Sequence, residues 1–199
     1  ENPGLPVYAP TLAWALAIEG DLAAARTMLH EARVSDFHLP MDLTWLIGQS
    51  FWMEVAHRVD DQDAVAVVLD RIEPWGHLMT CCHTGIAGVV WHYVGRGRLT
   101  LRDVDGAIED LERALEAHQE MRAPHLIATS EVALAEALLA SGGRQDLLRA
   151  RTLAESALAT AEACGYGYVR RDATAVLSRP GAAKPGFAGS GVSPYGSGH

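Results

Sequence analysis

The sequence has few of the residues that mark a secreted or disulfide-stabilised protein. It contains three cysteines in 199 residues, and two of them are adjacent, at Cys81 and Cys82. An odd count with this spacing does not form a disulfide framework, so we expect reduced thiols and a cytoplasmic location. No charged segment followed by an apolar run marks a signal peptide. The chain begins at Glu1 rather than at a methionine, and we expect it to be a piece of a longer protein.

Long hydrophobic runs and positive charge are also scarce. The apolar run from Ile86 to Val94 is too short to span a bilayer, and it contains His92. The net charge is −9 and the sequence pI is about 5.4, which argues against direct binding to nucleic acid or to an anionic membrane. Hydrophobic residues make up 49% of the chain, which is enough to bury one sizeable core.

The motifs of common catalytic sites are missing as well. The sequence has no G-x-S-x-G, no phosphate-binding G-x4-GK[ST] and no zinc-binding H-E-x-x-H. Glu54 and His57 lie on one face of a predicted helix. They could form an acid–base pair for catalysis, or they could line a binding surface. Residues so placed more often line a binding surface, so we expect no catalytic residue and no cofactor.

One cluster of side chains has the chemistry of metal ligands: His77, Cys81, Cys82 and His83. If this segment is helical, His77 and Cys81 lie one turn apart and could share a soft cation, with His83 or Cys164 completing the site. A structural zinc site usually brings two clean ligand pairs, and only one pair is present. We therefore expect no bound metal and interpret the cysteines as small hydrophobic residues.

What the sequence does contain is the signature of a helical hairpin between residues 91 and 114. Its first helix carries W-x2-(apolar)-G at Trp91 and Gly95, and its second carries A-x3-L-x2-A at Ala107, Leu111 and Ala114. Tetratricopeptide repeats use this spacing. We expect Gly95 and Ala107 where the two antiparallel helices cross, because larger side chains would push the helix axes apart.

Equivalent positions recur at Ala25, Val65, Ala107 and Ala150, with a period of about 40 to 43 residues. The recurrence predicts an all-α domain over residues 1–177. We expect a tetratricopeptide-like solenoid of about four antiparallel helical hairpins, closed by a short capping helix over residues 168–177. The alternative is a helical bundle without repeats.

Turn residues place the boundaries of these hairpins. Gly20 followed by Asp21 predicts a helix end and an N-cap, Asp60–Asp61 a turn, and residues 141–143 a break. Asp103 or Asp105 is expected to cap the second helix of the third hairpin. The first helix of that hairpin is expected to run through residues 84–88 to Trp91, so the sequence predicts essentially no strand.

Residues 178–199 form a Gly/Pro/Ser-rich tail that lacks the apolar residues to fold by itself. Helical-repeat grooves bind extended peptides. We therefore expect the tail to lie extended against a helical surface, with Phe187 or Tyr195 at least half buried.

Four stretches of the chain resemble one family: residues 12–26 (LAWALAIEGDLAAAR), 40–46 (PMDLTWL), 92–95 (HYVG) with the hairpin that follows, and 147–161 (LLRARTLAESALATA). They are similar to the tetratricopeptide-like C-terminal helical region of large bacterial, especially actinobacterial, signalling ATPases. Some members of that family carry an adenylate or guanylate cyclase domain, and others a LuxR-type helix-turn-helix. None of the cyclase, ATPase or DNA-binding motifs occurs in this chain. Val65 and Asp60 depart from the pattern, which has Ala and Gly at these positions.

The resemblance implies a non-catalytic scaffold that binds a protein or peptide partner and passes its occupancy to an ATPase, cyclase or DNA-binding core. The chain's own C-terminal tail is one candidate for that partner. The alternatives are a sensor that holds a small molecule in the hollow of the solenoid and a self-association module that forms homodimers. A deep closed pocket would favour the sensor.

Trp52 and Trp91 are expected in the core. Binding is expected on the first helices of the hairpins, at Trp14, Glu54, His57, His92, Arg96 and Glu136.

Overall fold

The computed structural model describes residues 5–82 and 85–179, and within these ranges the chain is mostly helical, as the sequence predicts. It has nine α-helices there, a short 3-10 helix (Glu73–Trp75) and a two-stranded antiparallel sheet. The helices are α1 (Tyr8–Glu19), α2 (Leu22–Val34), α3 (Trp45–Arg58), α4 (Gln62–Ile72), α5 (Val90–Thr100), α6 (Val104–Glu120), α7 (Pro124–Ser141), α8 (Arg144–Cys164) and α9 (Gly167–Leu177). The strands are β1 (Met79–Cys82) and β2 (Gly85–Val89).

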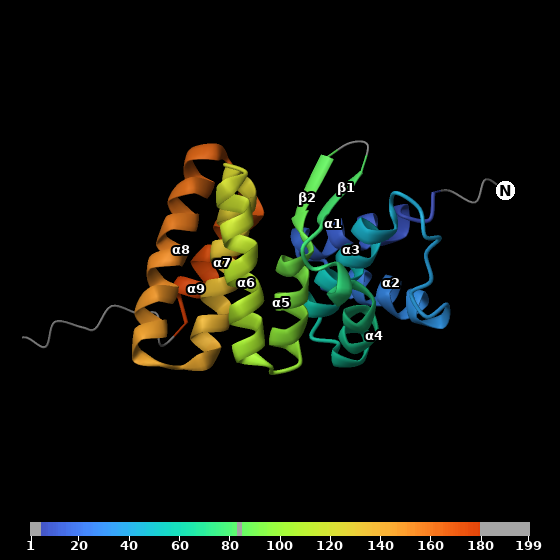
Figure 1. Ribbon diagram of the computed structural model, residues 1–199, viewed down its shortest axis with the longest axis horizontal. Helices are drawn as coiled ribbons and strands as arrows, with labels where there is room; N and C mark the ends of the chain where they lie inside the picture. Colours follow the sequence, from blue (N-terminus) through green and yellow to red (C-terminus); the bar gives the residue numbers. More distant parts are fainter. Residues whose placement is uncertain (1–4, 83–84, 180–199) are drawn as a thin grey trace, which may run out of the picture.

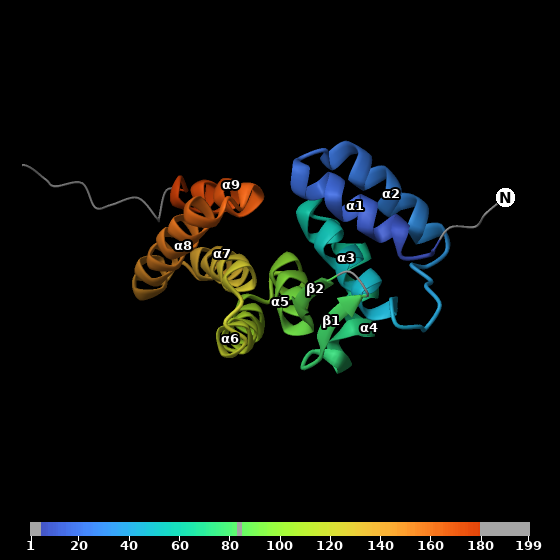
Figure 2. The same ribbon diagram turned by 90° about the horizontal axis from the view of Figure 1, so that it is seen from above.

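The helices form consecutive pairs, α1–α2, α3–α4, α5–α6 and α7–α8, followed by the single helix α9 (Figure 1). Seen from above, the pairs follow an arc that begins at α1 and α2, turns at α5 and ends at α9 (Figure 2). The capping helix expected over residues 168–177 is present as α9. None of the helices in residues 5–82 and 85–179 combines the length and the apolar character that a bilayer crossing needs.

Short turns with the expected capping residues join the helices of each pair. Gly20 ends α1 in the left-handed conformation, with φ of 98°. The side chains of Asp21, Asp61 and Asp103 each accept a hydrogen bond from a backbone N–H in the first turn of the helix that follows. These contacts satisfy N–H groups that have no partner within the helix, so the caps fix where α2, α4 and α6 begin.

The expectation of essentially no strand is wrong for the segment before Trp91. The β1–β2 hairpin occupies it, and α5 begins only at Val90. Gly88 has φ of +111°, which is incompatible with a right-handed helix, and the Thr80 hydroxyl donates to the Gly88 carbonyl at 2.9 Å. A β-bulge follows Thr80. Glycine at position 88 therefore permits the backbone conformation of the β hairpin, whereas the sequence pattern predicted a weak helix here.

The close crossing expected within the α5–α6 pair is confirmed. A Cβ atom built on Gly95 would lie 2.6 Å from Cγ of Leu111 and 3.1 Å from the Ala107 carbonyl oxygen. Ala107, Leu111 and Ala114 are fully buried. Trp91 is only partly buried: it packs on Gly76 and lies 5.1 Å from the Arg113 guanidinium.

Buried apolar residues form two clusters. The first core runs from Ala13 to Val94 and includes the buried Trp52, and the second core runs from Leu99 to Val176. Helix α5 belongs to both, because Val94 lies in the first core and Leu99 in the second. The expectations for Phe187 and Tyr195 lie outside the described residues.

Candidate functional site

A cavity of about 350 Å³ lies on the concave side of the arc. The odd-numbered helices α1, α3, α5, α7 and α9 each contribute to its wall, together with β2 and one residue of α6. In Figure 2, α1 and α9 lie at the two ends of the arc and α5 lies at its turn. The cavity is therefore built by residues from both ends of the described chain.

The structure brings most of the six residues expected on the concave face to this cavity. Trp14, Glu54, His92 and Arg96 line it. Glu136 lies directly behind its wall, where its carboxylate accepts from Arg96 Nη1 at 2.7 Å. The structure places these residues together, and their role in binding stays a prediction.

His57, like Glu136, does not line the cavity. Its Nδ1 lies 3.0 Å from the Arg96 carbonyl oxygen and 2.8 Å from Thr100 Oγ1, so the imidazole is engaged with α5. No hydrogen bond joins His57 to Glu54 in the described part of the chain. The acid–base pair considered for these two residues is therefore not assembled.

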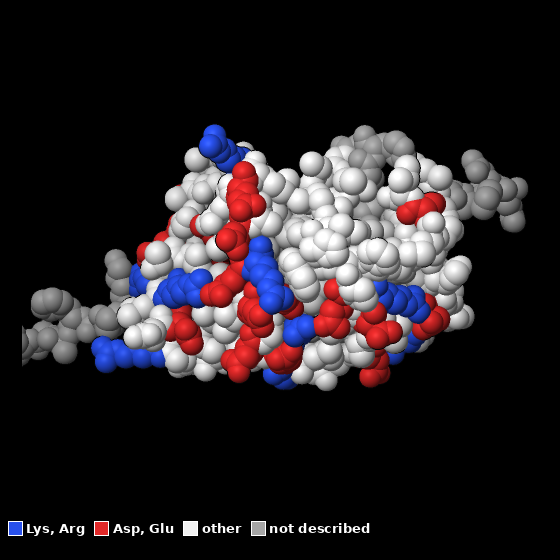
Figure 3. All heavy atoms as spheres, in the orientation of Figure 1, with Lys and Arg blue, Asp and Glu red and all other residues white. Residues whose placement is uncertain are grey.

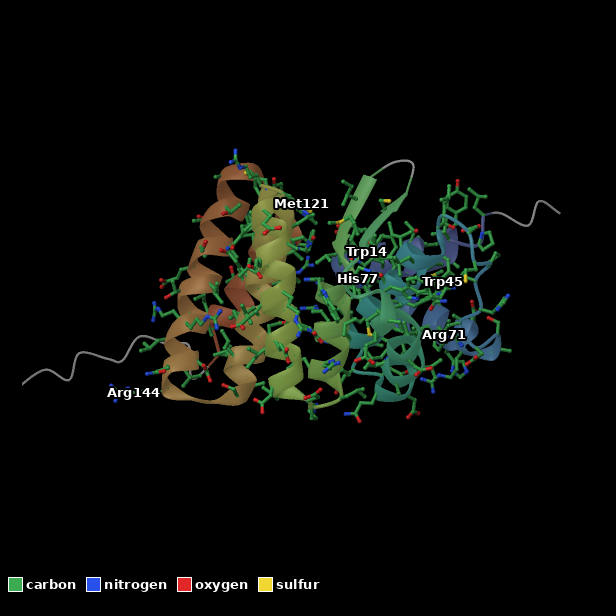
Figure 4. All side chains as sticks on the ribbon, in the orientation of Figure 1. Trp14, Trp45, Arg71, His77, Met121 and Arg144 are labelled. Carbon is green, nitrogen blue, oxygen red and sulfur yellow. The ribbon has the colours of Figure 1, made fainter. Side chains whose placement is uncertain are left out.

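Aromatic and aliphatic side chains make most of the cavity wall. The rings of Trp14 on α1 and Phe51 on α3 stack with centroids 4.7 Å apart. Tyr93 and Tyr168 add two further aromatic rings, and the aliphatic members are Val7, Ile18, Ile47, Ile86, Ala87, Leu126, Val132 and Val169. Figure 4 shows the labelled Trp14 near the middle of the molecule. A wall of this kind favours ligands with a substantial apolar surface.

A network of ion pairs forms the charged part of the wall. Arg96 donates to both carboxylate oxygens of Glu54, from Nη2 at 2.9 Å and from Nε at 3.1 Å. Arg58 donates from Nε to Glu54 at 2.7 Å and from Nη2 to Asp172 at 2.8 Å. The network thus joins α3, α5, α7 and α9, four helices that are far apart in sequence.

The network keeps its buried groups ionised. Burial alone would raise the pKa of Glu54, but the guanidinium groups of Arg96 and Arg58 outweigh it and hold that pKa well below its usual range. Burial alone would likewise lower the pKa of Arg96, yet Glu54 and Glu136 raise it. Each charge is therefore stable in the interior only because its partners are present.

A second polar chain connects the β hairpin to the cavity. The backbone N–H of Val89 donates to His118 Nε2 at 2.9 Å, so the proton of a neutral His118 resides on Nδ1. This Nδ1 lies 2.9 Å from Ser130 Oγ, and the same oxygen lies 3.2 Å from His92 Nδ1. We assign the direction of the chain as Val89 to His118 to Ser130 to His92, which places the proton of His92 on Nε2.

Burial keeps both imidazoles of this chain neutral. It lowers the pKa of His92 to about 3 and that of His118 to about 4. Neither ring carries a charge at neutral pH, so neither supplies a cation to a ligand.

The helical geometry assumed for a metal site does not occur. His77 lies in a turn and Cys81 lies in β1, both exposed, so they are not one helical turn apart. In residues 5–82 and 85–179, no three His, Cys, Asp or Glu side chains are placed to hold an ion. His83 lies outside the described residues.

Sequence reasoning missed several residues of the site. Arg58 follows Glu54 by one helical turn, and this spacing alone was a signal for an ion pair. Asp172 is 114 residues from its partner Arg58, and no local pattern connects them. Tyr168 and Ser130 join the site in the same non-local way.

The charged surface gives no sign of a nucleic-acid interface on the face in Figure 3. Acidic side chains run along α6 with basic side chains between and beside them, and few charges lie over the β hairpin. No family model, no curated protein and no solved structure matches the chain.

Proposed function

We propose that this domain is a non-catalytic sensor that binds a small molecule in the concave cavity. The observation that carries the proposal is the cavity itself: about 350 Å³, walled by stacked aromatic rings and by a buried network of ion pairs. Small-molecule sites are typically apolar hollows of about 300–1,000 Å³ with a few placed polar groups.

The position of the cavity suits a sensing role. Its wall includes α1 and α9, which lie at opposite ends of the arc, and it also contains the ion pair between Arg58 of α3 and Asp172 of α9. A ligand in the cavity would contact both ends and would favour one spacing between them. Occupancy would thereby become a change in the arrangement of the helices.

A protein or peptide partner could use the same cavity only with part of its surface. A volume of about 350 Å³ holds one or two large side chains, so such a partner would insert an anchor there. The size of the cavity therefore favours a small molecule as the effector.

The wider context follows from the resemblance to the signalling ATPases. We propose that the helix pairs are tetratricopeptide-like repeats of a cytoplasmic, ATP-dependent regulator. Ligand occupancy would then pass to an ATPase, cyclase or DNA-binding core elsewhere in that protein. The A-x3-L-x2-A spacing and the Gly95 crossing support the repeat assignment.

The test is a titration with N-phenyl-1-naphthylamine, an uncharged dye whose fluorescence rises in apolar sites. We expect saturable binding at one site per chain and energy transfer from tryptophan. Trp14→Ala should weaken binding at least about tenfold, because the variant removes a ring from the cavity wall. Leu148→Ala, an exposed residue on α8 outside the cavity, serves as the matched control. Absence of saturable binding, or equal losses in both variants, would refute the cavity as a binding site.

A further inference from the structure

The charges in the cavity wall already have partners. The wall contains two basic residues, Arg58 and Arg96, and two acidic ones, Glu54 and Asp172. All three nitrogen groups of the Arg96 guanidinium donate to carboxylates, two contacts going to Glu54 and one to Glu136. The formal charges of these four side chains therefore sum to zero.

A charged ligand would have to disrupt this network. An anionic ligand could pair with a guanidinium group only by displacing Glu54 or Asp172. The displaced carboxylate would then lose an ion-pair partner. A cation would compete in the same way for Glu54, whose side chain is 6% exposed. Breaking a buried pair leaves an uncompensated charge, which is strongly unfavourable.

The histidine at the wall offers a hydrogen bond and no charge. His92 Nδ1 is engaged with Ser130, and the direction assigned to the chain from Val89 through His118 and Ser130 places the proton of His92 on Nε2. This N–H has no acceptor in the described part of the chain, although His92 lines the cavity. A ligand oxygen or nitrogen with a lone pair would satisfy it.

The remaining wall selects for an apolar body. Trp14, Phe51, Tyr93 and Tyr168 present four aromatic rings from four helices. Aromatic walls gain from ring-to-ring contacts in addition to simple burial.

We infer that the ligand of this cavity is an uncharged, ring-containing molecule with a hydrogen-bond acceptor for His92. The inference rests on the proposed function, since it names the ligand class of the same cavity. It excludes sugars phosphorylated on any hydroxyl, nucleotides, amino acids and other ions as ligands of this cavity.

The experiment compares three compounds that share a naphthalene ring and differ in one substituent: 2-naphthalenemethanol, 2-naphthoate and 2-naphthylmethylammonium. Each competes with N-phenyl-1-naphthylamine on the full chain at neutral pH. The alcohol should displace the dye at a concentration at least about tenfold lower than either ion, because only the ions disturb the charge balance. The cation controls for the net charge of −9, which by itself would favour a cation over an alcohol.

A variant that changes the net charge of the cavity wall gives a second readout. Asp172→Asn leaves Arg58 with Glu54 as its remaining carboxylate, so the cavity wall gains one net positive charge. The affinity for naphthoate should rise several-fold relative to that for the alcohol. Asp70→Asn makes the same change in total charge on the exposed side of α4 and should leave the ratio unchanged.

The outcomes separate the two proposals. A Trp14-dependent site that binds either ion as tightly as the alcohol would overturn the ligand class and leave the cavity as a binding site. The assignment of an uncharged ligand would also be overturned if Asp172→Asn and Asp70→Asn changed the affinity for naphthoate, relative to that for the alcohol, by the same factor. If the dye itself shows no Trp14-dependent binding, the proposed function fails.

Discussion

Gly95 shows how one missing side chain sets the distance between two helices. Leu111 and the Ala107 carbonyl occupy the space where a Cβ atom would lie, at 2.6 and 3.1 Å. Leu111 is fully buried, so it has little room to move. Helices α5 and α6 approach this closely only because residue 95 is glycine.

Replacing Gly95 should therefore destabilise the protein. We expect Gly95→Leu to lower the free energy of unfolding by about 1–3 kcal/mol or more, because it overpacks the crossing. Urea denaturation measures the effect. Gly167→Ala is the matched control, since a Cβ there meets nothing within 4 Å and alanine favours the helix. A Gly95→Leu variant as stable as the wild type would show that residue 95 is not confined by Leu111.

The buried histidines should make stability depend on pH. Burial lowers the pKa of His118 from its ordinary 6.5 to about 4, so the unfolded chain binds a proton more readily than the folded one between these values. His118 contributes its full stabilisation above pH 6.5 and loses it as the pH falls toward 4. His57 and His92, with pKa values of about 3, act in the same direction.

His118→Gln should reduce this dependence, because the amide oxygen can accept from Val89 N–H but does not titrate. We expect the slope of unfolding free energy against pH to fall by up to about 1.4 kcal/mol per unit within that window. Urea titrations at several pH values measure it, and His30→Gln on the exposed side of α2 controls for the loss of a histidine. An unchanged slope would mean that His118 is protonated equally in both states.

At the scale of the elements, three turns share one design. In each, a residue with positive φ is followed by an aspartate N-cap: Gly20 with Asp21, Asp60 with Asp61, and Arg102 with Asp103. The positive φ reverses the chain, and the carboxylate then accepts from the first turn of the next helix. The design ends one helix and starts another within two or three residues.

Removing the Asp21 N-cap of α2 tests how much it contributes to the free energy of unfolding. Asp21 accepts from Ala24 N at 3.0 Å and lies on an exposed turn. Asp21→Ala should lower the unfolding free energy by about 0.5–2 kcal/mol, whereas Asp21→Asn should retain most of the stability because asparagine caps equally well. Thermal unfolding of both variants gives the comparison, and equal stability of Ala and Asn would contradict the capping role.

At the scale of the molecule, α5 and the ion network join the two cores. Arg58 of the first core's helix α3 pairs with Asp172 of α9 at 2.8 Å, and Arg96 links Glu54 to Glu136 of α7. Residue Arg171 of α9 also donates to the Ile18 carbonyl of α1. Loss of either core therefore removes partners of buried charges in the other.

We expect the two cores to unfold together. All five tryptophans lie between residues 14 and 91, so their fluorescence reports on the first core, whereas far-UV circular dichroism reports on all helices. The two signals should follow the same urea transition. A second transition seen only by circular dichroism would show that α6–α9 unfold independently of the first core.

The sequence by itself determined the local parts of this structure. Gly20 and Asp21, the turn at Asp60–Asp61, the cap at Asp103 and the break at residues 141–143 depend on backbone conformation and on contacts within one helical turn. The crossing at Gly95 was also predictable, because only the smallest residues permit it. Such features are readable from neighbouring residues alone.

Only the tertiary structure decided which distant groups meet. The pairing of Arg58 with Asp172 spans 114 residues, and the chain from Val89 through His118 and Ser130 to His92 joins four separate segments. The β hairpin is a further case, since its glycines fit weak helix and turn patterns equally until their pairing with β1 is known. Periodicity places a residue on a face of its own helix, but the position and charge of the facing residue depend on how the helix pairs curve around the cavity.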